Sequence, residues 1–322
     1  MAQEKNKSNF SVKNFILKNN TYLILLVLFI ICSVVSKDFL TLSNLVNICQ
    51  QYASTVIVSI GMLFVILTGG IDLSVGSIVA IGSVLTACSL NSWGWGVVPA
   101  CLISLLLGTA CGSFTGFLVA KTDMAPFVAS LAMMTMARGI AYMISNGAPI
   151  MTPVNTISVL GTAKIFSWLT WLAVIAVVIV IAAWFVTNYL SFGRITIAIG
   201  SNEEAVHLAG INTMPVKMAT YAISGFCFAI GGIIACSRTG IGSPAVGNGL
   251  ELDCIAACVI GGASLSGGVG SPVKTVVGVL VLALIGNIMN LLAVPSYPQD
   301  VIKGIIIIFA VLLQRVTNKN TN

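Results

Sequence analysis

The chain has 322 residues, of which 57% are hydrophobic and only 7% are charged, and its formal net charge is +6. A soluble domain carries about 25% charged residues, so this composition excludes an ordinary water-soluble protein. The apolar residues form long continuous runs, whereas the strands of a membrane β-barrel alternate polar and apolar residues. We therefore expect an all-α polytopic membrane protein.

Ten apolar runs follow one another along the chain. A spanning helix needs about 20 residues, and the first, third, eighth and tenth runs are shorter than that. The third and eighth runs are rich in Gly and Ser, which predicts broken or partly re-entrant helices. Together the runs form a transmembrane domain over 21–314, with basic tails at 1–20 and 315–322. The predicted spans are 21–36, 45–68, 76–90, 97–120, 127–146, 167–187, 217–238, 252–268, 272–292 and 299–314.

The positions of Lys and Arg predict the orientation of these spans. If the N-terminus is cytoplasmic, ten basic residues lie at inner ends of spans and four lie at outer ends, as the positive-inside rule requires. Ten spans return the C-terminus to the same side, so both termini are expected in the cytoplasm. The inner residues are Lys5, Lys7, Lys13, Lys18, Lys121, Arg194, Lys217, Lys274, Arg315 and Lys319; the outer ones are Lys37, Lys164, Arg238 and Lys303.

The first break in the helical pattern lies between the second and third runs, in the stretch LTGGIDLSVGS over 67–77. Gly69 and Gly70 are typical residues for ending a helix, and Ser74 precedes the next apolar run. Asp72 has two readings, which are compatible. Its carboxylate caps the following helix, or it belongs to a broken helix that lines a polar path through the membrane.

A similar break precedes the eighth run, where Glu251 and Asp253 follow Gly249. The segment from Gly70-Ile-Asp-Leu to Ile81-Gly82 is echoed by the segment from Gly249-Leu-Glu-Leu to Ile260-Gly261, and both offsets are 179 residues. In the ten-span arrangement the two segments start at opposite faces, as an inverted repeat requires. Chance similarity between Gly-rich helices is the alternative.

The inner loop over 188–216 is the longest charged stretch away from the termini. Within it, SNEEAVHLAG over 201–210 predicts a two-turn helix, because Ser201 and Glu204 form an S-x-x-E capping box and Gly210 is a natural stop. A helix of two turns is too short to be stable alone. It either rests on lipid headgroups or docks against another protein.

Several kinds of site are missing from the sequence. No Gly-Lys dipeptide occurs, so the chain has no phosphate-binding loop of the G-x-x-x-x-G-K-[ST] type. The single histidine, the absence of H-E-x-x-H and G-x-S-x-G, and nine cysteines without a CxxC pair argue against a hydrolase and a metal site. The basic residues are scattered rather than gathered in a stripe, which argues against nucleic-acid binding. Only Asp72, Arg138 and Asp253 place charge near span interiors.

Four segments resemble the ribose-type permeases of ATP-binding-cassette (ABC) importers, within the branched-chain/ribose permease superfamily. The resemblance runs from about Phe39 to Gln314 and departs from the familiar inner-loop motif at Val206, where an alanine is usual. The segments are GGIDLSVGSIVAIGS (69–83), GSNEEAVHLAGI (200–211), GLELDCIAACVIGGASLSGGVGSPVKT (249–275) and PSYPQDVIKGIIIIFAVLLQ (295–314).

This resemblance implies a non-enzymatic permease subunit in a bacterial cytoplasmic membrane that moves ribose or a similar monosaccharide. It implies three protein partners: a second permease subunit forming a homodimer, a cytoplasmic ATPase with two fused nucleotide-binding halves, and a periplasmic or lipid-anchored sugar-binding protein. ATP and Mg²⁺ would bind to the ATPase and no cofactor to this chain. The inner-loop motif would be a coupling helix that docks on the ATPase, with the residues Asn202, Glu203, Glu204, Ala205, Gly210 and Ile211.

The broken helices would then form the substrate path or its hinges, with Gly69, Gly70, Asp72, Ser74, Glu251 and Asp253 as the candidate residues. The alternative function is a secondary solute carrier that works without an ATPase. A structural or enzymatic membrane protein is a third class, and it predicts no solute flux.

Overall fold

The computed structural model describes residues 20–166 and 169–319. The tail predicted at 1–20 therefore lies outside the described residues except for its last position, as do residues 320–322 of the other tail. The described chain is mostly helical, and each of the ten predicted spans overlaps a helix. The helices are α2 (Asn20–Val35), α3 (Leu42–Leu67), α4 (Val75–Asn91), α5 (Val97–Lys121), α6 (Pro126–Ser145), α7 (Ile157–Thr162), α8 (Trp171–Tyr189), α9 (Ser191–Leu208), α10 (Met214–Thr239), α11 (Leu250–Ile260), α12 (Pro272–Leu291) and α13 (Ser296–Lys319).

Within the described residues, six helices are long and apolar enough to cross a membrane: α3, α5, α6, α8, α10 and α12. The helices α2 and α4 are apolar but shorter. Large apolar side chains on α2, α5, α6 and α8 are exposed on the chain, as a lipid-facing surface requires. These features describe a polytopic membrane protein.

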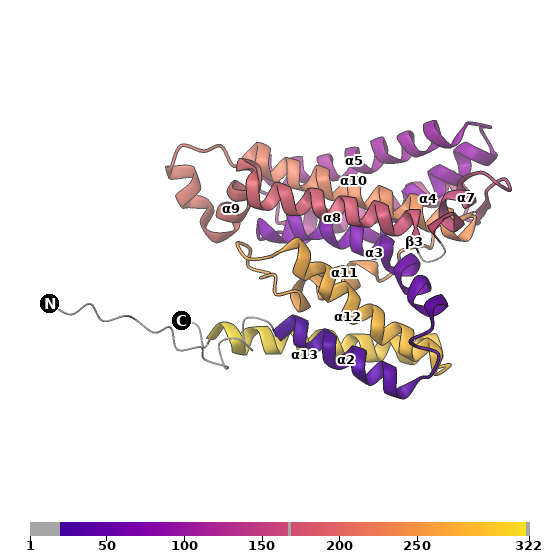
Figure 1. Cartoon of the computed structure of the whole chain (residues 1–322). Coiled ribbons are helices and arrows are strands. Elements are labelled where there is room, and N and C mark those ends of the chain that lie inside the picture. Colours follow the sequence, from indigo (N-terminus) through magenta and orange to yellow (C-terminus); the bar gives the residue numbers. More distant parts are fainter. Residues whose placement is uncertain (1–19, 167–168, 320–322) are drawn as a thin grey trace.

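Helix α10 is the centre of the bundle and packs against α3, α4 and α5 (Figure 1). Small residues allow this close packing. A side chain at Gly112 of α5 would collide with the backbone of Tyr221 on α10, and one at Gly225 of α10 would collide with Gly108. Membrane helices gain stability from such close approach, because lipid tails provide no hydrophobic force between helices.

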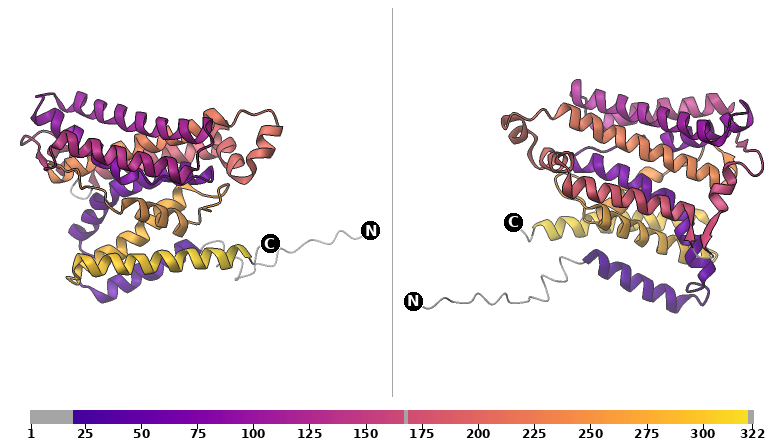
Figure 2. Two further views of the ribbon diagram at one scale, coloured as in Figure 1. Left: turned by 180° about the vertical axis from the view of Figure 1, so that it is seen from behind. Right: turned by 45° about the horizontal axis from the view of Figure 1, so that its top comes forward.

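Three parts of the chain share one end of the bundle, on the left in Figure 1: the beginning of α2, the end of α13, and α9. Figure 2 shows α13 (yellow) and α2 (indigo) on the side of the molecule away from α5. We call the shared end the α9 end. It is the side on which the sequence places the charged inner loop.

Short elements cover the opposite end. The strand β1 (Ile150–Met151) pairs antiparallel with β4 (Ile241–Gly242), and β2 (Lys164–Phe166) pairs with β3 (Leu169–Thr170). The predicted span at 167–187 begins later, at Trp171, because β3 precedes it; residues 167–168 lie outside the described residues. Thr170 is the N-cap of α8, and its hydroxyl oxygen fixes the start of this helix by accepting the N–H of Ala173.

The helices depart from the predicted spans and loops at three further places. The eighth span was expected to run to residue 268, but α11 ends at Ile260, because Gly262 has φ +85 and stops the helix. The inner loop at 188–216 is mostly helix α9, which starts directly after α8 because Gly193 lets the two helices pack closely. The tail predicted from residue 315 is helical to Lys319.

Candidate functional site

The docking segment, residues 202–211, begins at a break inside α9. Asn202 leaves the helical conformation with φ −163° and ψ 98°, and its side-chain Oδ1 accepts the N–H of Ala205 at 2.9 Å. Asn202 is thus the N-cap of a second, short helix. The prediction of Ser201 as the cap is wrong, because Ser201 still belongs to the preceding helix and its hydroxyl donates to the carbonyl of Ile197.

The docking segment ends as the sequence predicts. Gly210 has φ +78°, a conformation that side-chain-bearing residues rarely adopt, and its N–H donates to the carbonyl of His207. Val206 is buried against the bundle, whereas Glu204, Ala205 and Leu208 are exposed, Leu208 to 79%. The segment therefore presents a mixed polar and apolar surface beyond the α9 end.

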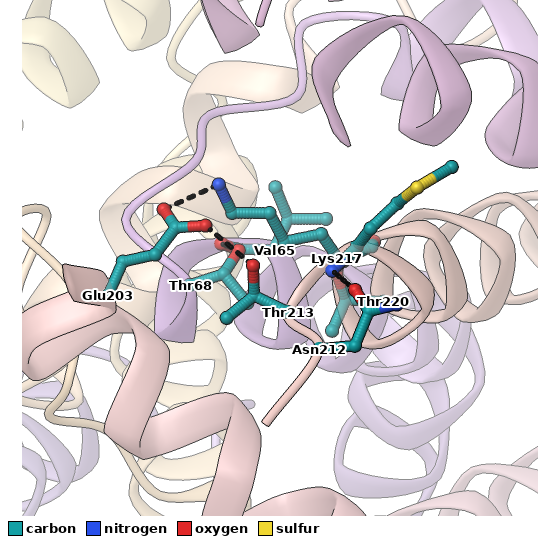
Figure 3. A network of polar contacts seen from close by, with 8 residues as sticks. Val65, Thr68, Glu203, Asn212, Thr213, Lys217 and Thr220 are labelled. Atoms are coloured by element: carbon teal, nitrogen blue, oxygen red, sulfur yellow. Dashed lines mark hydrogen bonds and ion pairs between the residues drawn. The ribbon is translucent and has the colours of Figure 1, made fainter. Parts of the chain in front are cut away.

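An ion pair fixes the docking segment to α10 (Figure 3). One carboxylate oxygen of Glu203 lies 2.6 Å from Nζ of Lys217, and the other accepts a hydrogen bond from the hydroxyl of Thr213 at 3.0 Å. Thr213 and Lys217 flank the start of α10. A force on the docking segment would therefore reach the central helix of the bundle directly.

A second connection leads from α9 to both broken helices. Gly200 lies directly against the carbonyl of Leu67, at the end of α3, and against Gly267 and Gly268 in the loop that follows α11. The N–H of Gly268 also donates to the carbonyl of Leu67 at 3.0 Å. Three backbones thus meet with no side chain between them, two residues before the docking segment begins.

The first broken helix begins with a non-helical stretch over 68–74, which we call the inner lead-in. Asp72 is fully buried within it. Its carboxyl group accepts the N–H and the hydroxyl of Ser74 at 2.9 and 2.5 Å, and the hydroxyl of Ser224 on α10 at 3.3 Å. Asp72 thus holds the turn into α4 against α10. The N–H that it accepts belongs to Ser74, which precedes the start of α4 at Val75. Asp72 therefore closes a turn before the helix and is not the predicted cap.

The second broken helix begins with the outer lead-in, the non-helical residues 243–249. The guanidinium of Arg138 on α6 donates to the carbonyls of Pro244 and Val246 at 2.6 and 2.9 Å. Gly247 is in backbone contact with Gly76, in the first turn of α4. The two breaks therefore meet where α4 begins.

The first turn of α11 carries the two acidic residues that the sequence singles out. Glu251 and Asp253 are both partly exposed. The carboxylate of Glu251 lies beside Gly76, and Asp253 forms an ion pair with Lys303 of α13, with 3.5 Å between Oδ2 and Nζ. These side chains lie at the second break and not with Asp72, which faces α10.

The structure thus divides the predicted site residues into two groups. The docking segment holds Asn202, Glu203, Glu204, Ala205, Gly210 and Ile211, and it lies at the α9 end near Gly69 and Gly70. Asp72, Ser74, Glu251 and Asp253 lie deeper, around the two breaks. Sequence reasoning missed Lys217, Gly200 and Gly267 as partners. The pair Gly267-Gly268 was visible as a glycine cluster, but the sequence did not show what it contacts.

Comparisons with known proteins agree over most of the chain. A family model described as "Branched-chain amino acid transport system / permease component" matches residues 44–311. The ribose import permease protein RbsC of Escherichia coli (strain K12) is 37% identical over 315 residues, which cover 94% of this chain and 95% of that protein.

Two further relatives also align with most of this chain. The ribose import permease protein RbsC of Bacillus subtilis (strain 168) is 41% identical over 306 residues, covering 92% of each chain. The xylose transport system permease protein XylH of Escherichia coli (strain K12) is 33% identical over 345 residues, covering 88% of this chain and 87% of that protein. No solved structure matches this chain.

Proposed function

This chain belongs to the branched-chain amino acid transport system / permease component family, and on that premise we propose that it imports ribose, xylose or a similar monosaccharide as the membrane subunit of an ABC importer. It is a non-enzymatic transport subunit. The ribose and xylose permeases that align with most of the chain support the choice of a pentose.

An ABC permease works with an ATPase and, in an importer, with a substrate-binding protein. We expect a second copy of this chain as the other permease, an ATPase with two fused nucleotide-binding halves, and a periplasmic or lipid-anchored binding protein. ATP and Mg²⁺ would bind to the ATPase, which supplies the chemistry of hydrolysis. This chain contributes the docking surface and the gate.

We assign the docking segment as the coupling helix that contacts the ATPase. Its capped, exposed surface at the α9 end supports this, as does the ion pair between Glu203 and Lys217. Glu204, Ala205 and Leu208 supply the contact surface. Asn202 and Gly210 fix the two ends of the helix, and Ile211 flanks it.

The observation that carries the mechanism is the contact of Gly200 with Leu67 and Gly267. Because these backbones touch, displacement of the docking segment moves the end of α3 and the loop after α11 together. Those two segments adjoin the broken helices, so the same displacement reaches the breaks. ATP-driven closure of the motor would in this way change which side of the membrane the path faces.

We propose that the two breaks are the hinges of the path and belong to an inverted repeat. The inner lead-in extends from the α9 end to the start of α4, and the outer lead-in extends from β4 to the start of α11. The contact of Gly76 with Gly247 joins them. Complete burial favours a hinge role for Asp72 over contact with sugar, whereas Glu251 and Asp253 are open enough to meet it.

We further propose ten spans, formed by α2 to α6, α8 and α10 to α13, with both termini in the cytoplasm of a bacterial inner membrane. The protein is multi-pass and homologous to inner-membrane permeases. The shared position of the start of α2, the end of α13 and α9 supports an even number of crossings (Figure 1).

Co-purification with the ATPase tests the docking segment. We expect the wild type to retain the ATPase in detergent and Gly210→Asp to lose it, because the change places a charge on the docking surface and strains a residue with φ +78°. Gly94→Asp is the matched control: Gly94 also has positive φ and open space around it, but it lies between α4 and α5. Equal retention in both variants would contradict the assignment.

A further inference from the structure

The outer lead-in exposes backbone within the membrane-spanning part of the chain. Ala245, Asn248 and Gly249 are exposed, and a side chain added at Gly249 would find no atom within 4 Å. Non-helical backbone at membrane depth leaves peptide groups without intrahelical partners, so it is tolerated only where protein buries it or where it lines water. The open space beside Gly249 therefore favours water over lipid.

The ion pair between Asp253 and Lys303 is also partly open, with side chains 28% and 31% exposed. It joins the broken helix α11 to α13, a helix with few other contacts to the bundle. Two charges in this position are costly next to lipid and stable next to water.

The depth of the pair follows from its neighbours. The thiol of Cys258 on α11 donates to the carbonyl of Ser59, which lies eight residues before the end of α3, or about 12 Å at 1.5 Å per residue. Asp253 precedes Cys258 by five residues on α11, which places it about 7 Å farther from the α9 end than Cys258. The pair is thus near the middle of a hydrocarbon core about 30 Å thick.

We propose that the outer lead-in, Asp253 and Lys303 line a water-filled path, and that this ion pair is a binding site for the hydroxyl groups of a passing monosaccharide. The inference rests on the proposed import of a sugar and names where the sugar is held. The carboxylate of Asp253 accepts hydroxyl protons and the ammonium of Lys303 donates to hydroxyl oxygens. A neutral polyol can therefore replace the bond that the two side chains make with each other.

Thiol labelling of the assembled complex in vesicles tests for water at this position. Lys303→Cys is made in a background in which the exposed Cys49 and the partly buried Cys101 are serine. Ile305→Cys is the matched control, because Ile305 is 51% exposed at nearly the same depth but about 200° away around α13.

We expect a membrane-impermeant methanethiosulfonate cation to modify Lys303→Cys about tenfold faster than Ile305→Cys, because only a hydrated thiol forms the reactive thiolate. Equal rates, or no reaction at Lys303→Cys, would overturn the proposal and indicate that lipid or the second permease copy covers the pair. Retained co-purification of the ATPase shows that each variant is assembled.

Uptake by the same complexes separates sugar contact from structural pairing. Asp253→Asn and Lys303→Gln should each reduce uptake about tenfold, the effect of one charge-assisted hydrogen bond, and the double variant should not recover. Asp300→Asn is the control, because Asp300 lies 4.0 Å from Lys303 but is 76% exposed; its uptake should stay within about twofold.

A double variant with wild-type uptake would show that the pair is only structural and would refute this inference. Failure of the wild-type complex to import either sugar would instead refute the proposed function. The two failures are therefore distinguishable in one set of vesicles.

Discussion

The contact of Gly200 with the end of α3 and with the loop after α11 can be tested by adding a single methyl group. In Gly200→Ala the new methyl group would collide with the carbonyl oxygen of Leu67 and with the backbone N of Gly268. Both are backbone atoms, which cannot rotate away as a flexible side chain would. The three segments must therefore separate.

Two opposing effects determine how much Gly200→Ala changes the stability of the protein. Overpacking of this kind costs about 1–3 kcal/mol. Replacing Gly by Ala within a helix contributes at most about 1 kcal/mol in the opposite direction, and less here because Gly200 is close to the break at Asn202. We expect a net destabilisation of about 1–2 kcal/mol.

The assay combines thermal unfolding in detergent with uptake in vesicles. Gly139→Ala is the matched control, because Gly139 lies within α6 and a methyl group there would find no atom within 4 Å. We expect a lower unfolding midpoint for Gly200→Ala only, and a fall of about fivefold in sugar imported per ATP hydrolysed. Unchanged stability and coupling in Gly200→Ala would refute the mechanical connection through this contact.

Three further changes test the docking segment and the first break. Asn202→Ala removes the cap and should cost the short helix about 1 kcal/mol, seen as weaker ATPase binding, whereas Asn202→Asp should bind normally. Asp72→Leu leaves the N–H and the hydroxyl of Ser74 unpaired, whereas the hydroxyl of Ser224 keeps the carbonyl of Tyr221 as its acceptor. The change should lower the unfolding midpoint, at about 1–3 kcal/mol for each unpaired donor, with a smaller loss in Asp72→Asn. In Glu203→Gln the half-exposed pair with Lys217 is lost, which should change stability by less than about 1 kcal/mol but reduce coupled uptake; a large loss of stability with normal uptake would contradict its assigned role.

The spanning helices could be predicted because apolar runs of this length have few other stable forms in lipid. The ends of the helices were harder to predict where they depend on a few residues. Ser201 and Glu204 match a capping box, yet the helix from Ser191 continues through Ser201, and Asn202 becomes the cap instead. The run after Leu250 remains apolar past Gly261, so hydropathy alone does not show that α11 stops at Ile260.

The connections between the two groups of site residues could not be read from the sequence. Gly200 and Gly267 are 67 residues apart, and only the folded chain brings their backbones together. Arg138 was visible as a charge inside a span, but its partners are main-chain carbonyls of the outer lead-in, which any sequence supplies. Lys303 reads as an outer-end charge, although it pairs with Asp253.

The central claim is that this chain is a gate without its own source of energy, driven through the docking segment. The most direct test is uptake of labelled ribose or xylose into vesicles that hold the purified chain alone, or the chain with its ATPase, its binding protein and ATP. We expect accumulation above the outside concentration only in the complete system. Accumulation against a gradient by the chain alone would contradict the claim.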